Sequence, residues 1–140
     1  MVTISDTRIR NTVFETVYDL INGAKSGYNT VSTPTLYGGH PDLDSVSFPA
    51  IIINPITVSE ADYTVDSTRN VTTKNIVVVV EVYSKGNKDV DNLADGVTYT
   101  LRNSTFSGAF LTGVQDDDGV LFPNDGKVKQ KTLTFTFMRR

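Results

Sequence analysis

The sequence contains no cysteine, and this absence excludes several kinds of chemistry at once. Disulfide bonds, thiolate metal sites and cysteine nucleophiles are all impossible, which fits a chain that folds in a reducing cytoplasm. Histidine is nearly absent too, since His40 is the only one. Any histidine-dependent catalytic relay or metal site must therefore use His40. Its setting, GGHPDLDS, is instead typical of an exposed loop.

Long apolar segments and an excess of positive charge are also missing. The longest apolar run, residues 76–80, is far too short to cross a bilayer, and the N-terminus lacks an apolar stretch of signal-peptide length. We therefore expect no contact with a membrane. The formal net charge is −3 and the basic residues are scattered, which argues against specific nucleic-acid binding.

Sequence signatures of metal or phosphate chemistry are not recognisable either. The run Asp116 to Asp118 offers oxygen ligands, but Gly119 comes too early for an EF-hand, and Lys127 stands where the bidentate glutamate belongs. We interpret this run as a solvated acidic turn. The glycine pair in GGHP precedes His-Pro rather than a helix, so it does not form a phosphate-binding loop. The sequence thus predicts no enzyme activity, no metal and no cofactor.

The composition is that of one folded domain. With 140 residues, of which 39% are hydrophobic, the chain can bury enough apolar surface to offset the entropy of ordering it. We assign residues 1–140 to a single soluble domain. Helical spacing of apolar residues predicts a helix over about residues 6–23, capped by Ser5 or Asp6 and ended by Gly23. A second helix is predicted over 89–103, capped by Asp89, although Gly96 lowers its helix propensity.

Strands are predicted from alternating or unbroken apolar stretches. The segment 24–47 is mostly irregular, with a short strand near 35–37, and a buried strand fits between Pro49 and Pro55. Residues 75–84 are apolar on both faces, which indicates a central strand. The last stretch, KVKQKTLTFTFMRR, predicts a half-buried strand, whereas 105–118 is punctuated by glycine and aspartate. The polar, threonine-rich segment 57–74 predicts an exposed hairpin.

The predicted architecture is therefore α+β. It consists of an antiparallel β-sheet with two α-helices packed on one face, plus an extended β-hairpin arm. The residues expected to form the core lie on the apolar face of each element, and they are Val13, Val17, Leu20, Ile52, Val78, Val80, Leu93, Val97, Leu101, Phe135 and Phe137.

The order of these parts resembles the tail terminator (tail completion) proteins of long-tailed bacteriophages. The stretches that carry the resemblance are DTRIRNTVFETVYDLING, FPAIIINPI, NIVVVVEVYSKGNKD, VDNLADGVTYTL and KTLTFTFMRR. The resemblance implies a homo-oligomer, a hexameric ring that caps the tail tube, stops its growth and meets the head–tail connector. It also implies that the protein, made in the host cytoplasm, ends in the neck of the virion, where DNA passes through the ring.

Candidate interface residues are chosen from charge and position, because the family offers no short motif to transfer. They are Glu60, Asp62, Tyr63, Asp66, Arg69, Arg139 and Arg140. Arg69 among three acidic residues gives the arm a mixed-charge surface, which suits contacts between subunits. The two C-terminal arginines are consistent with an exposed end that meets a neighbouring molecule.

Two other kinds of function stay open from the sequence. One is a different neck or tail component, either a head completion protein or a tail tube subunit. The other is a small ligand-binding domain or enzyme, since acidic residues far apart in sequence can meet in space. The state of assembly distinguishes the functions. A closed ring would support the terminator, an open polymer a tube subunit, and a monomer with a deep pocket a ligand-binding domain or enzyme.

Overall fold

The computed structural model describes residues 2–3, 8–39, 46–66, 69–104, 106–107, 109–121 and 128–139. Side chains are described in these ranges except at 2–3, 61–66, 69–72, 106–107 and 118–121. The elements in chain order are β1 (Val2–Thr3), α1 (Ile9–Ala24), the 3₁₀ turn η1 (Lys25–Gly27), β2 (Thr35–Gly38), β3 (Ala50–Ile53), β4 (Thr57–Asp66), β5 (Arg69–Ser84), α2 (Asn87–Arg102), β6 (Phe106–Ser107), β7 (Ala109–Leu121) and β8 (Val128–Arg139).

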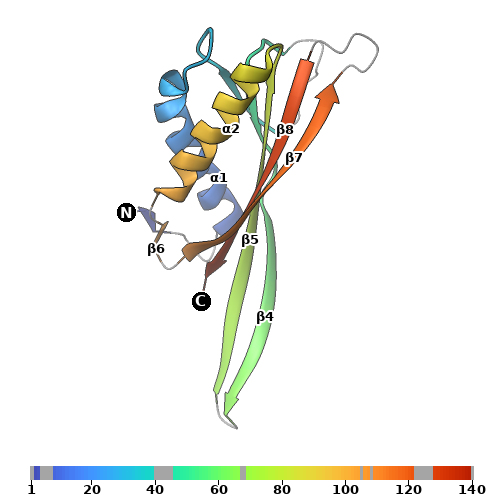
Figure 1. Ribbon diagram of the computed structural model, residues 1–140. Coiled ribbons are helices and arrows are strands. Elements are labelled where there is room, and N and C mark those ends of the chain that lie inside the picture. The colour runs from blue at the N-terminus through green and yellow to red at the C-terminus, as the bar shows by residue number, and fades with distance from the viewer. Residues whose placement is uncertain are drawn as a thin grey trace.

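One twisted sheet forms the body of the protein, with both helices on the same side of it (Figure 1). The strand order is β1-β6-β7-β8-β5-β3-β2, and β4 pairs with β5. The predicted α+β class with two helices on one face is thus confirmed. The sheet is antiparallel except at its margins, where β2 pairs with β3 and β1 with β6 in parallel.

Strand β5 is the centre of the sheet, as its apolar faces predict. It pairs with β8 from Lys74 to Ser84 on one side, while β3 and β4 pair with successive stretches of it on the other. Between those stretches the backbone amide of Asn54 donates a hydrogen bond of 3.0 Å to the backbone carbonyl of Val79. Strand partners on both sides cover the edges of β5. Because successive side chains point to opposite faces of the sheet, every second residue of β5 can be buried against the helices.

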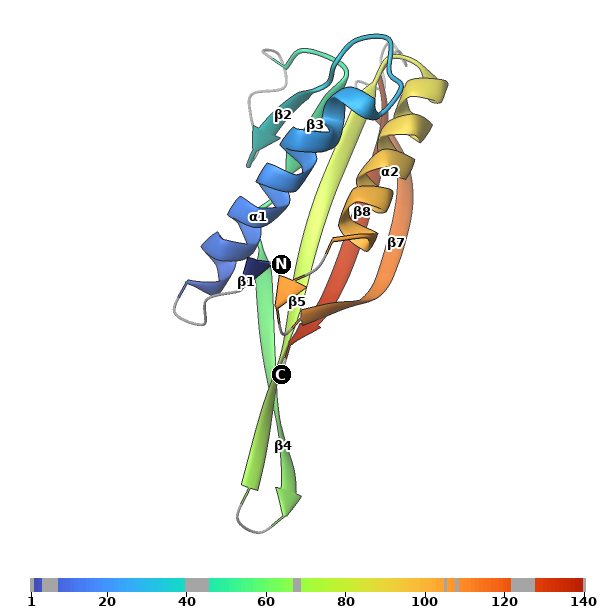
Figure 2. The ribbon, with the colours of Figure 1, turned by 90° about the vertical axis from the view of Figure 1, so that its left-hand side faces the viewer.

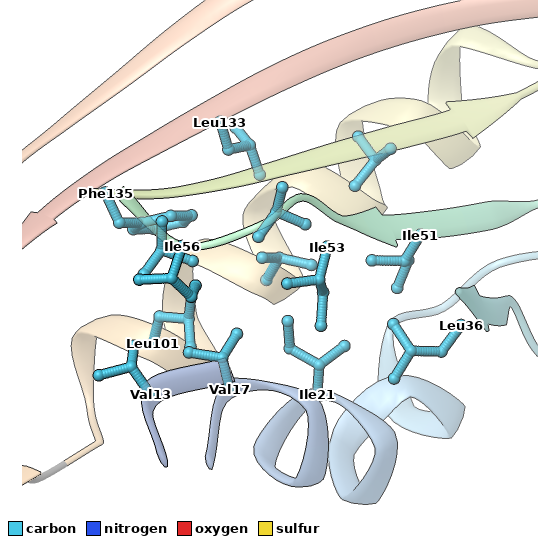
Figure 3. Packing of buried hydrophobic residues seen from close by; sticks show 14 of the residues in the cluster. Val13, Val17, Ile21, Leu36, Ile51, Ile53, Ile56, Leu101, Leu133 and Phe135 are labelled. Carbon is cyan, nitrogen blue, oxygen red and sulfur yellow. The ribbon is translucent and has the colours of Figure 1, made fainter. Parts of the chain in front are cut away.

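The core lies between the helices and the sheet. Figure 3 shows Val13, Val17 and Ile21 of α1 pointing toward residues of the sheet, among them Ile51 and Ile53. Every residue predicted for the core is buried except Leu20, which is only partly buried. Position 20 lies at the edge of the helical stripe, where α1 faces the side of α2 rather than the sheet. Ile52 is buried on the other face of the sheet, in a smaller cluster with Val46, Ala50, Tyr83 and Val128.

Both helices begin and end differently from the sequence prediction. Gly23 does not end α1, because the helix continues through it to Ala24 and passes into η1 without a left-handed residue. Ser5 and Asp6 lie outside the described residues. Asp89 does not cap α2, which begins at Asn87 after an extended Gly86. Its carboxylate instead accepts a 3.3 Å hydrogen bond from the backbone amide of Val31.

Strand β7 is the largest element that the sequence did not predict. Residues 109–121 pair with β8 along nearly their whole length, so the run Asp116 to Asp118 lies in a strand and not in a turn. The predicted acidic turn is therefore wrong. Asp116 and Asp117 are exposed at the margin of the sheet. Charged side chains at such a margin discourage edge-to-edge aggregation.

Candidate subunit interface

The hairpin of β4 and β5 projects far beyond the rest of the sheet (Figures 1 and 2). Strand β8 ends its pairing with β5 at Lys74, opposite Arg139. In the part of the chain that the structure describes, residues 69–73 of β5 have β4 as their only strand partner. The predicted arm over 57–74 therefore exists as a two-stranded ribbon with open edges.

The register of the ribbon brings some of the candidate interface residues together. Asp66 lies opposite Arg69, Tyr63 opposite Val71 and Asp62 opposite Thr72 along the two backbones.

Glu60 forms an ion pair with Lys74, at 3.7 Å between Oε1 and Nζ. The Glu60 side chain is 60% exposed, so this pair contributes little to stability and leaves the carboxylate accessible to another molecule.

The other candidates from the sequence are not part of the arm. Arg139 is half-buried, at the point where β8 pairs with Lys74 on one side and with Ala109 of β7 on the other. It therefore lies near the base of the ribbon rather than at a fully exposed end. Arg140 and His40 lie outside the described residues.

A polar network occupies the sheet face opposite the helices. The hydroxyl of Tyr83 donates to Oε2 of the Glu81 carboxylate at 2.6 Å, and Nδ2 of the Asn54 side chain donates to Oε1 of the same carboxylate at 3.4 Å. Gln130 donates to the Tyr83 hydroxyl at 3.3 Å. Burial raises the pKa of Tyr83, and the hydrogen bond and negative charge of Glu81 raise it further. Tyr83 therefore stays neutral and serves to hold Glu81 in place.

The described residues contain no group of three or more histidine, cysteine, aspartate or glutamate side chains that could hold a metal ion. Among the same residues, no helix has the length and apolar character needed to span a membrane.

Chelation should leave the stability of the protein unchanged, because no ligand set of recognised spacing is present in the sequence. Melting curves with and without EDTA check this directly. A drop of several degrees on adding EDTA would restore the calcium hypothesis for Asp116 to Asp118.

A groove runs between the end of α1 and the middle of α2, two helices that lie side by side in Figure 2. Its volume is about 700 Å³. The residues that line it are Leu20, Gly23, Ala24, Gly27, Tyr28, Asn29, Asn92, Asp95, Gly96, Tyr99, Thr100 and Asn103. Tyr99 is 72% exposed at its rim, which is unusual for a large aromatic side chain. The groove was not predicted from the sequence.

Gly96 shapes the groove because Tyr28 packs directly against it. A Cβ atom at position 96 would lie 2.6 Å from Cγ of the Tyr28 ring, closer than real Cβ contacts allow. The Tyr28 hydroxyl is 2.6 Å from Oγ1 of Thr100, one turn further along α2. Burial raises the pKa of Tyr28, and the hydrogen bond to Thr100 offsets part of that rise. The one sequence signal of this contact was the glycine inside an amphipathic helix.

Replacing Gly96 with alanine should destabilise the protein, although alanine is the better helix former by about 1 kcal/mol. The new methyl group would overlap the Tyr28 ring, and overpacking of this kind costs about 1–3 kcal/mol. Gly23→Ala in α1 is the matched control, because a Cβ there meets nothing within 4 Å. Urea unfolding should show Gly96→Ala less stable than wild type and Gly23→Ala slightly more stable. Equal stability of the two variants would contradict the packing role of Gly96.

The comparisons with known proteins concern the fold. No protein-family model matches the sequence, and no curated protein is similar enough to match. Among solved structures, the chain is similar to a chain of the structure described as "Virion of native gene transfer agent (GTA) particle", with a TM-score of 0.61. The match covers 88% of this chain and 90% of that chain at 14% sequence identity. This α+β sheet with its two helices is therefore a fold that also occurs in a chain of that virion.

Proposed function

We propose that this chain is a virion structural protein, a tail terminator whose copies assemble into a hexameric ring that caps the tail tube and joins it to the head connector. The observation that carries the proposal is the β4–β5 arm. Beyond Lys74 the arm is a two-stranded ribbon, and isolated ribbons of this kind are marginally stable in water. A partner that packs against the arm would stabilise it.

A neighbouring copy of the chain is the partner that a ring provides. In a closed ring, one patch of each subunit contacts a different patch of the next, so a single arm contact is repeated at every joint. The exposed Glu60 carboxylate, with Asp62, Asp66 and Arg69 along the same ribbon, would fix the register of that contact through charge, and Tyr63 would belong to the same contact. Arg139, at the base of the ribbon, would lie beside the same joint.

The likeness to a chain of a gene transfer agent virion supports a structural role over a catalytic one. In that role the partners would be further copies of the chain, the tail tube protein and the head–tail connector. Head completion proteins and tube subunits are the competing functions of the same class. They differ from a terminator in what they assemble into, and this difference guides the test.

Tail length in the virus that encodes the chain is the quantity that tests the terminator function. Inactivating the gene should produce tubes of uncontrolled length that do not join heads, because nothing caps them. Electron microscopy of the lysate measures both properties, and restoring the gene in trans is the control. Heads joined to tails of normal length would refute the terminator function, and a complete absence of tubes would favour a tube subunit.

A further inference from the structure

Several polar side chains of the groove between α1 and α2 donate hydrogen bonds to the protein itself. The Thr100 hydroxyl donates to the carbonyl of Gly96 at 2.8 Å. A hydroxyl has one hydrogen, so in the 2.6 Å contact between Tyr28 and Thr100 the Tyr28 hydroxyl must be the donor. The hydroxyl hydrogens of Tyr28 and Thr100 are therefore both used inside the protein.

The amide side chains of the groove also donate to the protein itself. Nδ2 of Asn92 donates to the carbonyl of Asn29 at 3.0 Å, which ties α2 to the segment after η1. Nδ2 of Asn103 donates to the carbonyl of Tyr99 at 2.9 Å. Each bond leaves the amide oxygen as an acceptor and the second hydrogen of the amide nitrogen as a donor.

The groove therefore offers these two amide oxygens as acceptors and one negative charge, beside the second amide hydrogens and the Tyr99 hydroxyl. Within the described part of the chain, the carboxylate of Asp95 makes no hydrogen bond or ion pair, and Asp95 is exposed. The lining contains no lysine or arginine. Tyr99 lies one helical turn after Asp95, so its exposed ring and the carboxylate share one side of α2.

We propose that this groove binds an arginine side chain presented by another polypeptide. A guanidinium group supplies five donors and no acceptor, which complements the free acceptors of Asp95, Asn92 and Asn103. Its positive charge matches the carboxylate, and its flat face stacks on an aromatic ring such as that of Tyr99. Gly23, Asp95 and Tyr99 are all exposed, so a side chain carried by a second protein can reach them. The proposal does not depend on assembly of the protein into a hexameric ring.

A titration of the isotope-labelled full chain tests this proposal with N-acetyl-L-arginine amide as the probe. NMR with TROSY detection follows the backbone amides and tolerates a large assembly. We expect saturable shifts centred on Gly96, Tyr99 and Thr100. The citrulline analogue, which has the same shape without the charge, should bind about tenfold more weakly, which corresponds to about 1.4 kcal/mol. The lysine analogue should also bind more weakly, since it lacks the planar fork of donors.

Two substitutions on α2 separate the groove from general surface charge. Asp95→Asn removes the carboxylate that lines the groove, and we expect it to weaken arginine binding about tenfold, to the level of citrulline. Asp91→Asn is the matched control, because Asp91 lies one turn earlier and pairs with Lys131 at 3.4 Å outside the groove. It should leave binding unchanged. Equal binding of arginine and citrulline, equal effects of the two substitutions, or shifts spread evenly over both helices would each overturn the proposal.

Discussion

Truncating Phe135 to alanine should lower the free energy of unfolding by about 3–5 kcal/mol. Phe135 is fully buried in β8, opposite Val78 of β5 and Val114 of β7, and it belongs to the cluster beneath the helices. Its removal would leave a cavity in a layer whose neighbours are held by strand pairing on both sides. Such a layer collapses poorly, so most of the lost contact is not recovered.

Phe110→Ala is the control for Phe135→Ala, because Phe110 has the same side chain and lies on the adjacent strand, yet it is 50% exposed. Its truncation should cost no more than about 1 kcal/mol. Urea unfolding of both variants at one protein concentration gives the comparison, since assembly would otherwise change the apparent stability. A loss below about 1 kcal/mol for Phe135→Ala would mean that this face is not the core.

Deleting residues 60–72 should abolish ring assembly without unfolding the domain. The deletion removes the arm up to the base where β8 begins to pair with β5, so the pairing of β5 with β8 and β3 is kept. The pair Ser59 and Asn75 stays in register, and a short Gly-Ser link closes the shortened hairpin. Among the side chains that the structure describes, the buried clusters are formed by residues outside 60–72, so we expect stability to change little.

Circular dichroism and light scattering after gel filtration measure the fold and the assembly size of this deletion variant. A full-length protein with Asp116 and Asp117 both changed to asparagine serves as its control, because it alters exposed acidic residues away from the arm. We expect the control to assemble like wild type. If the deletion variant still assembles and still caps tails at normal length, the arm is a passive surface loop.

Elements whose own residues alternate or recur were predictable from the sequence. The central strand β5 and the last strand β8 carry apolar residues at every second position, and α1 carries them at every third or fourth. Burial enforces these patterns directly, since a shift of one residue would expose Phe135 or Val78. The arm was also predictable, because residues 57–74 are too polar to pack on the core but favour strands.

Elements and contacts that depend on distant partners were not predictable. Strand β7 contains Gly113 and three successive aspartates, which locally favour a turn, and it forms a strand because β8 offers its edge. Asp89 looked like a helix cap, but its hydrogen bond goes to Val31, far away in sequence. The groove depends on Tyr28 packing against Gly96, and a glycine inside a helical pattern does not reveal which distant residue packs against it.

Native mass spectrometry of the purified full chain shows whether the protein forms a closed ring. A closed ring gives one assembly whose size does not grow with protein concentration. When the ring closes, every subunit has both of its interface patches occupied, so no further subunit can be added. We predict a single hexameric species over a wide concentration range. A monomer at all concentrations, or an open series of growing oligomers, would contradict the ring.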